Sequence, residues 1–149
     1  METFSRGTLQ PWWVTGFCDG EASFTFSRSN ANVALYFAVK LTATDQPVLE
    51  QLQDYFGVGK IYRVGPRSSR EGSGFTKTAS LFRVTRHDEL PAVTRHFDMY
   101  PLVSEKAAAY GIWRAMVELK TKFRGRNGEA LKELAYSLSA AQPRNRSWR

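Results

Sequence analysis

Apolar and polar residues alternate in two pairs of short segments, and this pattern predicts two β-hairpins. Phe24 and Phe26 alternate with polar residues, and every second side chain from Leu35 to Leu41 is a large apolar one, so each segment is expected to form a strand with one apolar face. The turn-forming residues 29–32 separate the two strands and predict a tight connection. A second pair of strands is predicted at residues 60–64 and 79–85, joined by a polar loop.

Helical signals follow each hairpin. After the first hairpin, Thr44 or Asp45 is expected to cap a helix that has Pro47 in its first turn and ends at Gly57. After the second hairpin, a short helix is predicted for residues 88–97.

A long helix is predicted to begin after Ser104, which is a favourable N-cap, and Glu105 suits the positive end of the helix dipole. A shorter amphipathic helix follows after residue 129. The chain therefore reads as one α+β domain over residues 1–149, with a core at about 11–122 and a C-terminal helix and basic tail at 129–149. The predicted buried stripe of the long helix consists of Ala109, Ile112, Trp113, Met116 and Val117.

The segment before the first strand is unusual because it combines two glycines with two acids. Gly16 and Gly20 are four residues apart and share one helix face, where a second backbone can approach closely. Glycine inside a helix costs about 1 kcal/mol relative to alanine, which favours a structural role. Asp19 and Glu21 lie where the strand begins. If the neighbouring helix belongs to a second subunit, the two Glu21 carboxylates meet and repel unless cations lie between them.

Residues 14–22, with the sequence VTGFCDGEA, resemble the LAGLIDADG motif of homing endonucleases and intron maturases. The segment YPLVSEK at residues 100–106 resembles a second conserved segment of the same family. The resemblance covers about residues 11–122. It implies an αββαββα fold, in which a curved antiparallel sheet carries helices on one face.

The resemblance also implies a metal site. The last acid of the motif, Glu21, is expected to bind the catalytic Mg²⁺ or Mn²⁺, helped by the carbonyl of Gly20, and Lys106 is a second candidate catalytic residue. For Lys106, a role as an ordinary surface lysine at a helix start is equally open. Asp19 is expected to have a structural role at the end of the helix in preference to a role in catalysis. The residues assigned to a homodimer interface are Trp13, Gly16, Phe17, Asp19 and Gly20.

Double-stranded DNA is the partner that the resemblance implies, bound on the polar face of the sheet. Hydroxyl groups, lysine and tyrosine on alternate residues can reach base edges and phosphates in the major groove. A plain solvated sheet face remains the alternative for any single residue. The sheet residues assigned to DNA are Thr25, Ser27, Ser29, Tyr36, Lys40, Lys60 and Tyr62, with Arg83 and Thr85 as further members. Arg63, Arg67 and Arg70, which flank the second hairpin loop, are assigned to phosphate contacts.

Composition narrows the possible classes of protein and partner further. In a chain of 149 residues, 42% hydrophobic residues predict a folded core, and a formal net charge of +7 favours a polyanionic partner. Cys18 is the single cysteine, which excludes an intrachain disulfide and predicts a packed thiol. His87 and His96 show no zinc-ligand spacing and are expected to flank a short helix as polar residues. No signal segment or long apolar run is seen, which predicts an intracellular protein with no membrane partner, in a bacterial or archaeal cytoplasm or in an organelle.

The sequence thus predicts a metal-dependent, intron-encoded homing endonuclease that cuts a long pseudo-palindromic site as a homodimer and leaves 3′ overhangs. Two positions depart from the family pattern: Ala22 replaces the usual glycine, and Ala43 replaces a glutamine that positions water in many relatives. A non-cleaving maturase that acts on RNA, or a DNA-binding regulator, therefore stays open as an alternative. A protein-interaction module that uses the glycine helix only to dimerise is a third possibility.

Overall fold

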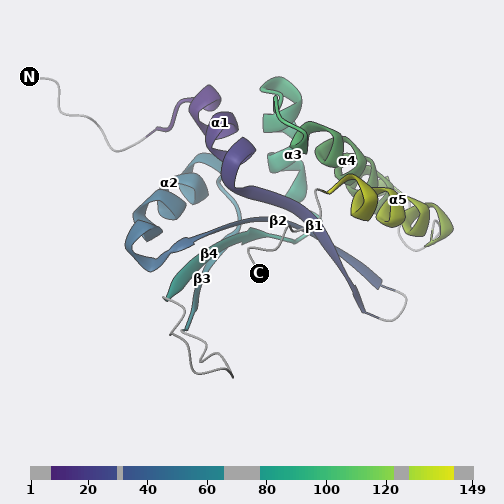
Figure 1. Cartoon of the computed structure of the whole chain (residues 1–149), viewed down its shortest axis with the longest axis horizontal. Helices are drawn as coiled ribbons and strands as arrows, with labels where there is room; N and C mark the ends of the chain where they lie inside the picture. Colours follow the sequence, from purple (N-terminus) through teal and green to yellow (C-terminus); the bar gives the residue numbers. More distant parts are fainter. Residues whose placement is uncertain (1–7, 30–31, 66–77, 123–127, 143–149) are drawn as a thin grey trace, which may run out of the picture.

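A four-stranded antiparallel sheet, in the order β1-β2-β4-β3, carries every described helix on one side (Figure 1). This computed structural model describes residues 8–29, 32–65, 78–122 and 128–142. The predicted order of helices and strands, and the α+β class, are confirmed. The elements are α1 (Pro11–Glu21), β1 (Ala22–Ser29), β2 (Asn32–Thr42), a 3₁₀ turn (Ala43–Asp45), α2 (Gln46–Phe56), β3 (Lys60–Val64), β4 (Ala79–Val84), α3 (Leu90–Met99), α4 (Lys106–Lys122) and α5 (Gly128–Ala141).

The core fills the space between the sheet and the helices. Phe24 on β1 and Phe37 on β2 are directly opposed, and both rings are buried. The Phe24 ring also contacts the rings of Phe97 on α3 and of Tyr110 and Trp113 on α4, with centroids 5.1–5.3 Å apart. Such edge-on aromatic contacts add to the hydrophobic stabilisation from burial. The predicted stripe of α4 is confirmed, although its Ile112 is only partly buried.

The ends of α2 follow the sequence signals in part. Gly57 ends the helix in the left-handed conformation, with φ of 72°, as glycine permits at this position. Asp45 is the N-cap residue, but its side chain makes no capping hydrogen bond. Its Oδ2 instead accepts a hydrogen bond of 3.4 Å from Thr42 Oγ1. Asp45 is at the same time the last residue of the 3₁₀ turn that directly precedes α2.

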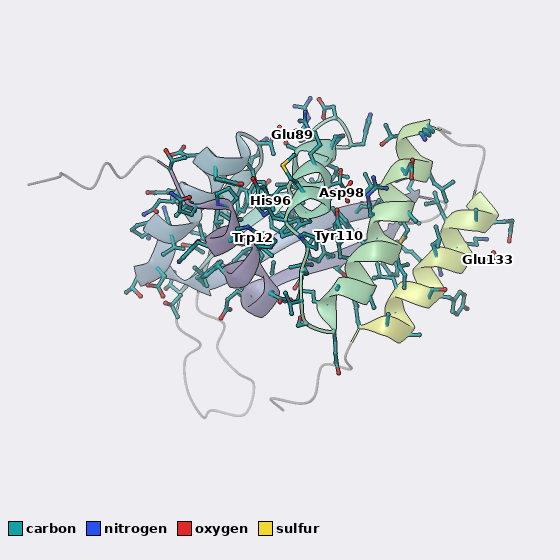
Figure 2. The ribbon with its side chains drawn as sticks, turned by 90° about the horizontal axis from the view of Figure 1, so that it is seen from above. Trp12, Glu89, His96, Asp98, Tyr110 and Glu133 are labelled. Atoms are coloured by element: carbon teal, nitrogen blue, oxygen red, sulfur yellow. The ribbon has the colours of Figure 1, made fainter. Side chains whose placement is uncertain are left out.

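His96 is not a polar residue flanking a short helix, as predicted, but a buried residue inside α3. Thr15 Oγ1 donates to the carbonyl of Tyr100 at 2.8 Å, so the 3.0 Å bond between Thr15 and His96 Nε2 needs its hydrogen on the histidine. His96 Nδ1 then accepts from the Tyr55 hydroxyl at 2.9 Å. Burial lowers the pKa of His96 to about 4. Seen from above, His96 of α3 lies close to α1, and Tyr110 belongs to the neighbouring helix α4 (Figure 2).

Side chains from the last two helices cover β1, which is an edge strand of the sheet. Trp113 Nε1 on α4 donates to the carbonyl of Thr25 at 3.0 Å, and Gln142 Nε2, just after α5, donates to the carbonyl of Phe24 at 2.9 Å. Lys120 donates through Nζ to the carbonyl of Val33 at the start of β2. The backbone of this edge is therefore hydrogen-bonded to the helical layer. Among the described helices, none combines the length and the apolar character that a membrane crossing requires.

Candidate functional site

Helix α1 passes into strand β1 without a loop, and Glu21 stands at this junction. Ala22 is already extended, with φ of −84° and ψ of 158°, while its N–H still donates to Cys18. Gly20 and Glu21 lie in the last helical turn, where carbonyls lack intrahelical partners. Glu21 is exposed, and within the described part of the chain its carboxylate takes part in no hydrogen bond or ion pair. An exposed carboxylate thus stands at the end of a helix, beside the backbone carbonyls of the last helical turn.

Asp19 ties this junction to the segment that leads into α4. Its Oδ2 accepts hydrogen bonds from the backbone N–H of Val103 at 3.1 Å and of Ser104 at 3.0 Å, and its Oδ1 accepts from Ser104 Oγ at 2.5 Å. Partial burial alone would raise the pKa of Asp19, but these hydrogen bonds outweigh it, and the pKa is lowered. Ser104 Oγ in turn accepts from the N–H of Lys106 at 3.2 Å, which confirms the predicted cap of α4.

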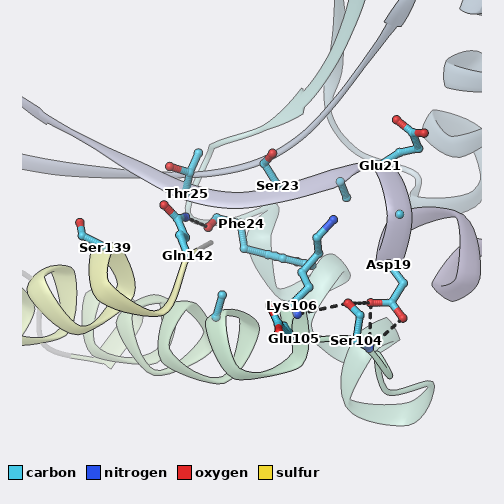
Figure 3. A pocket seen from close by; sticks show the side chains of 13 residues that line it. Asp19, Glu21, Ser23, Phe24, Thr25, Ser104, Glu105, Lys106, Ser139 and Gln142 are labelled. Carbon is cyan, nitrogen blue, oxygen red and sulfur yellow. Dashed lines mark hydrogen bonds between the residues drawn. The ribbon is translucent and has the colours of Figure 1, made fainter. Parts of the chain in front are cut away.

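Lys106 points from the first turn of α4 toward the end of α1. Its Nζ donates to the carbonyl of Cys18 at 3.1 Å, where the negative end of the α1 dipole favours a cation. Burial lowers the pKa of Lys106, while the nearby carboxylates of Asp19 and Glu21 oppose this. In Figure 3 the Glu21 carboxylate points away from Lys106, across the α1–β1 junction. The two candidate catalytic residues therefore share the junction but do not form an ion pair with each other.

Cys18 lies beneath the junction as a packed thiol, as predicted. Its side chain is fully buried, and burial raises its pKa to about 12. A thiol with this pKa stays protonated at neutral pH and is a poor nucleophile.

An open pocket of about 1030 Å³ lies between the α1–β1 junction and helices α4 and α5. Figure 3 shows the side chains that reach into it from these elements. Two of its lining residues, Asp19 on α1 and Gln142 just after α5, are 123 positions apart in the sequence (142 − 19), so only folding brings them together. Its lining includes Asp19, Gly20, Glu21, Ser23, Thr25, Ser104, Lys106, Ser139 and Gln142.

The exposed face of α1 carries the residues assigned to a subunit interface. Trp13 is 46% exposed, and its ring stacks on that of Phe17 at 5.0 Å and 8°. Added Cβ atoms at Gly16 and Gly20 would meet nothing within 4 Å. The described part of a single chain thus gives no steric reason for either glycine. Asp19 was assigned to the same interface, but its carboxylate accepts hydrogen bonds from Val103 and Ser104 of its own chain.

The polar face of the sheet brings together most of the residues assigned to DNA. The strand register puts Arg83 beside Ala38 on one side and Lys60 on the other, and it puts Tyr36 opposite Thr25. None of the described strands places an aspartate or glutamate on this face. The assigned residues that share it are Thr25, Ser27, Ser29, Tyr36, Lys40, Lys60, Tyr62 and Arg83, and Thr85 directly follows the end of β4.

The three loop arginines differ from this set. Arg63 pairs with the buried Ser80 and therefore lies on the helix-bearing side of β3, opposite to Lys60 and Tyr62. Arg67 and Arg70 lie outside the described residues.

Two sets of contacts among the candidate site residues could not be predicted from the sequence. The Arg83 guanidinium lies over the ring of Tyr36 at 5.1 Å and over that of Tyr62 at 5.0 Å. The tyrosines and the arginine were each assigned to the polar face, but only the strand order brings them together. The anchoring of Val103 and Ser104 by Asp19 gave no signal beyond the resemblance, because the partners are more than 80 residues apart.

Comparisons with known proteins give one consistent family. Residues 14–117 match the family model described as LAGLIDADG endonuclease. The chain is 33% identical over 130 residues to an uncharacterized 50.9 kDa protein in ND4 intron 1 of Podospora anserina, covering 80% of this chain and 26% of the relative. It is 30% identical over 111 residues to a probable intron-encoded endonuclease 3 of Neurospora crassa, covering 70% and 19%. The chain spans about a quarter of the length of such curated relatives.

Solved structures agree with the predicted fold. The LAGLIDADG meganuclease I-AabMI, bound to uncleaved DNA, is 31% identical with a TM-score of 0.70, covering 85% of this chain and 42% of that one. The structure of I-SmaMI bound to an uncleaved DNA target in the presence of calcium ions is 26% identical with a TM-score of 0.73, covering 92% and 47%. This chain therefore corresponds to about half of each of these structures.

Proposed function

The chain belongs to the LAGLIDADG endonuclease family, and from this premise we propose that it is a homing endonuclease that cleaves both strands of a specific double-stranded DNA site. The observation that carries the proposal is the exposed Glu21 carboxylate, which has no hydrogen-bond partner in the described residues and stands beside the open pocket at the α1–β1 junction. If Glu21 were an ordinary surface residue, the open glycine face of α1 and the basic face of the sheet would have no common explanation.

The residues at the junction fit a hard divalent cation such as Mg²⁺ or Mn²⁺ when two chains and DNA contribute together. Glu21 offers carboxylate oxygens and Gly20 a carbonyl oxygen, which are the ligand types these ions prefer. The described residues of one chain contain no group of three or more acidic, histidine or cysteine side chains able to hold a metal. DNA phosphates and a second Glu21 would complete the set. Such an ion supplies Lewis acidity and a water of lowered pKa.

Two copies of the chain form the proposed enzyme. A second α1 related by twofold symmetry could pack on the open surface at Gly16 and Gly20. The exposed stack of Trp13 on Phe17 would add apolar area to this contact. The solved relatives are about twice as long as this chain, which supports two such units in one working nuclease. Twofold symmetry would give a long, near-palindromic site with one half per subunit.

Within this site Lys106 is proposed to neutralise charge on the scissile phosphate. Its ammonium is held by the Cys18 carbonyl and lines the same pocket as Glu21. Removing a charged group that stabilises a transition state typically costs about 10²- to 10³-fold in rate. Lys106→Ala should therefore slow cleavage by about this factor while leaving binding largely intact, as single-turnover rates on bound DNA would show.

The test of the proposed function is cleavage of a randomised duplex library with Mg²⁺ and with EDTA, followed by sequencing of the ends. Recurrent staggered cuts with 3′ overhangs at one long site, present only with Mg²⁺, are the expected result. Glu21→Gln should abolish cutting and preserve binding. Glu133→Gln, which changes an exposed acid on α5, serves as the matched control and should cut normally. Cutting by Glu21→Gln at the wild-type rate would contradict the metal assignment.

A binding protein without cleavage, either an RNA-splicing maturase or a DNA-binding regulator, remains the second candidate. Ala22 follows Glu21 directly, and Ala43 lies in the 3₁₀ turn after β2, so both family departures lie at or near ends of the site strands. The same library experiment separates the two functions, since a regulator would retain one DNA sequence without cutting it, and a maturase would favour RNA. An interaction module without a nucleic-acid partner would show no steep fall of DNA affinity with salt.

A further inference from the structure

Four polar side chains form a continuous row across the open face of the sheet, one from each strand. Ser27 on β1 is hydrogen-bonded to the Tyr36 hydroxyl on β2 at 2.7 Å. The Tyr36 ring contacts the Arg83 guanidinium on β4 at 5.1 Å, and Arg83 contacts the Tyr62 ring on β3 at 5.0 Å. The row follows the strand order β1-β2-β4-β3, so each contact joins neighbouring strands.

This row fixes the Arg83 side chain before any ligand binds. The guanidinium lies between two aromatic rings, and arginine is strongly attracted to such faces. Ala38, directly opposite Arg83 on β2, leaves room for the long side chain to lie there. Because the ordering of a flexible arginine normally opposes binding, an arginine that is already held loses less freedom when it contacts a ligand.

The hydrogen-bonding groups of Arg83 divide into a buried one and two open ones. Nε is buried and has no hydrogen-bond partner in the described structure, whereas the two Nη groups are not buried. No acidic side chain lies on the described strands of this face to pair with them. The end of the guanidinium therefore presents its Nη donors, without an internal acceptor, from an inner strand of the sheet.

From this geometry we infer that Arg83 reads a guanine base in each half of the DNA site. The inference rests on the proposed function in that the partner is DNA in contact with this face. Two parallel N–H donors match the O6 and N7 acceptors of guanine in the major groove. An inner strand faces base edges, whereas phosphates flank the groove, so the position of β4 favours a base over a phosphate. Lys60, opposite Arg83 on edge strand β3, is better placed for the backbone.

The test is selection of a randomised duplex library by binding, without metal, for the wild type and for three variants. In the wild type, one position of each half-site should be guanine, with about 10- to 100-fold discrimination against other bases. Arg83→Lys keeps the charge but loses the paired donors, and Arg83→Ala loses both. Both should lose the preference at that position alone. Lys60→Ala should instead weaken binding to all sequences and reduce its salt dependence.

Two results would overturn the inference: an unchanged guanine preference in Arg83→Lys, or a uniform loss of affinity with a smaller salt slope in both Arg83 variants, as for a phosphate contact. Circular dichroism of each variant checks that the sheet is intact. The selection measures binding and does not require cleavage. If the wild type never cuts DNA but the Arg83 variants lose the preference for one guanine, the proposed nuclease function is refuted and the inference about Arg83 is supported. A protein that cuts one site, with Arg83→Lys selecting the same bases, refutes the inference alone. Enrichment of no sequence by the wild type overturns the inference as well.

Discussion

Asp19 is expected to stabilise the fold by holding the start of α4 against the end of α1. Its carboxylate accepts hydrogen bonds from three donors, the N–H groups of Val103 and Ser104 and the hydroxyl of Ser104. An ordinary hydrogen bond contributes about 0.5–1.5 kcal/mol, and a buried bond to a charged group more. Because this carboxylate is partly solvated, the lower range applies. Asp19→Ala should therefore destabilise the protein by about 2 kcal/mol, and Asp19→Asn, which keeps one acceptor oxygen, by about 1 kcal/mol.

Thermal unfolding at pH 7 and fixed protein concentration measures this effect. For a domain of this size, 1 kcal/mol shifts Tm by about 2–4 °C, so Asp19→Ala should lower Tm by about 4–8 °C. Asp88→Asn is the matched control, because Asp88 is an exposed acid paired with the exposed Arg86, and its Tm should not change measurably.

The pH dependence gives a second check on Asp19. Its pKa is lowered in the folded protein from the ordinary value of 3.8. Its stabilisation is therefore complete above that value and is lost as the pH falls through the lower folded pKa. The difference in stability between wild type and Asp19→Asn should shrink below about pH 4. Equal stability of the two proteins at pH 7, or a difference that persists unchanged to strongly acidic pH, would refute the reasoning.

Two further predictions concern association and acid stability. Gly16→Leu should leave the single chain folded, since an added Cβ meets nothing within 4 Å, but it should shift the sedimentation coefficient from that of a dimer to that of a monomer. Gly111→Leu, at an equally open glycine of α4, is the control and should leave the dimer intact. A Gly16→Leu protein that still sediments as a dimer would argue against the α1 interface. The pKa of His96 is lowered from 6.5 to about 4 in the folded protein. The free energy of unfolding should therefore decrease as the pH falls from about 6.5 to 4, because over that range only the unfolded chain takes up the proton. His96→Gln should flatten the chemical-denaturation profile over this range, and an identical slope in both proteins would contradict the assignment.

Much of the fold followed from local patterns. Strand alternation, the glycine that ends α2 and the Ser104 cap each depend on a few neighbouring residues, and all three are confirmed. Contacts between distant segments did not follow. The pairing of His96 with Thr15 and Tyr55 depends on how α3 packs against α1 and α2, so a pattern within α3 could not reveal a buried histidine. For the same reason the polar face could be predicted residue by residue, whereas the stacking of Arg83 between two tyrosines required the strand order.

The hydrogen bonds from Trp113 and Gln142 to β1 also bear on how the chain can associate with itself. An open sheet edge is a template on which further strands add without limit, which leads to aggregates. Because side chains of the helical layer already occupy backbone acceptors of β1, growth along this border is disfavoured. The proposed contact through α1 would instead use the same patch on both copies and would close after two. If the chain pairs as proposed, the contacts that cover β1 would favour a closed pair over a polymer that grows from this edge.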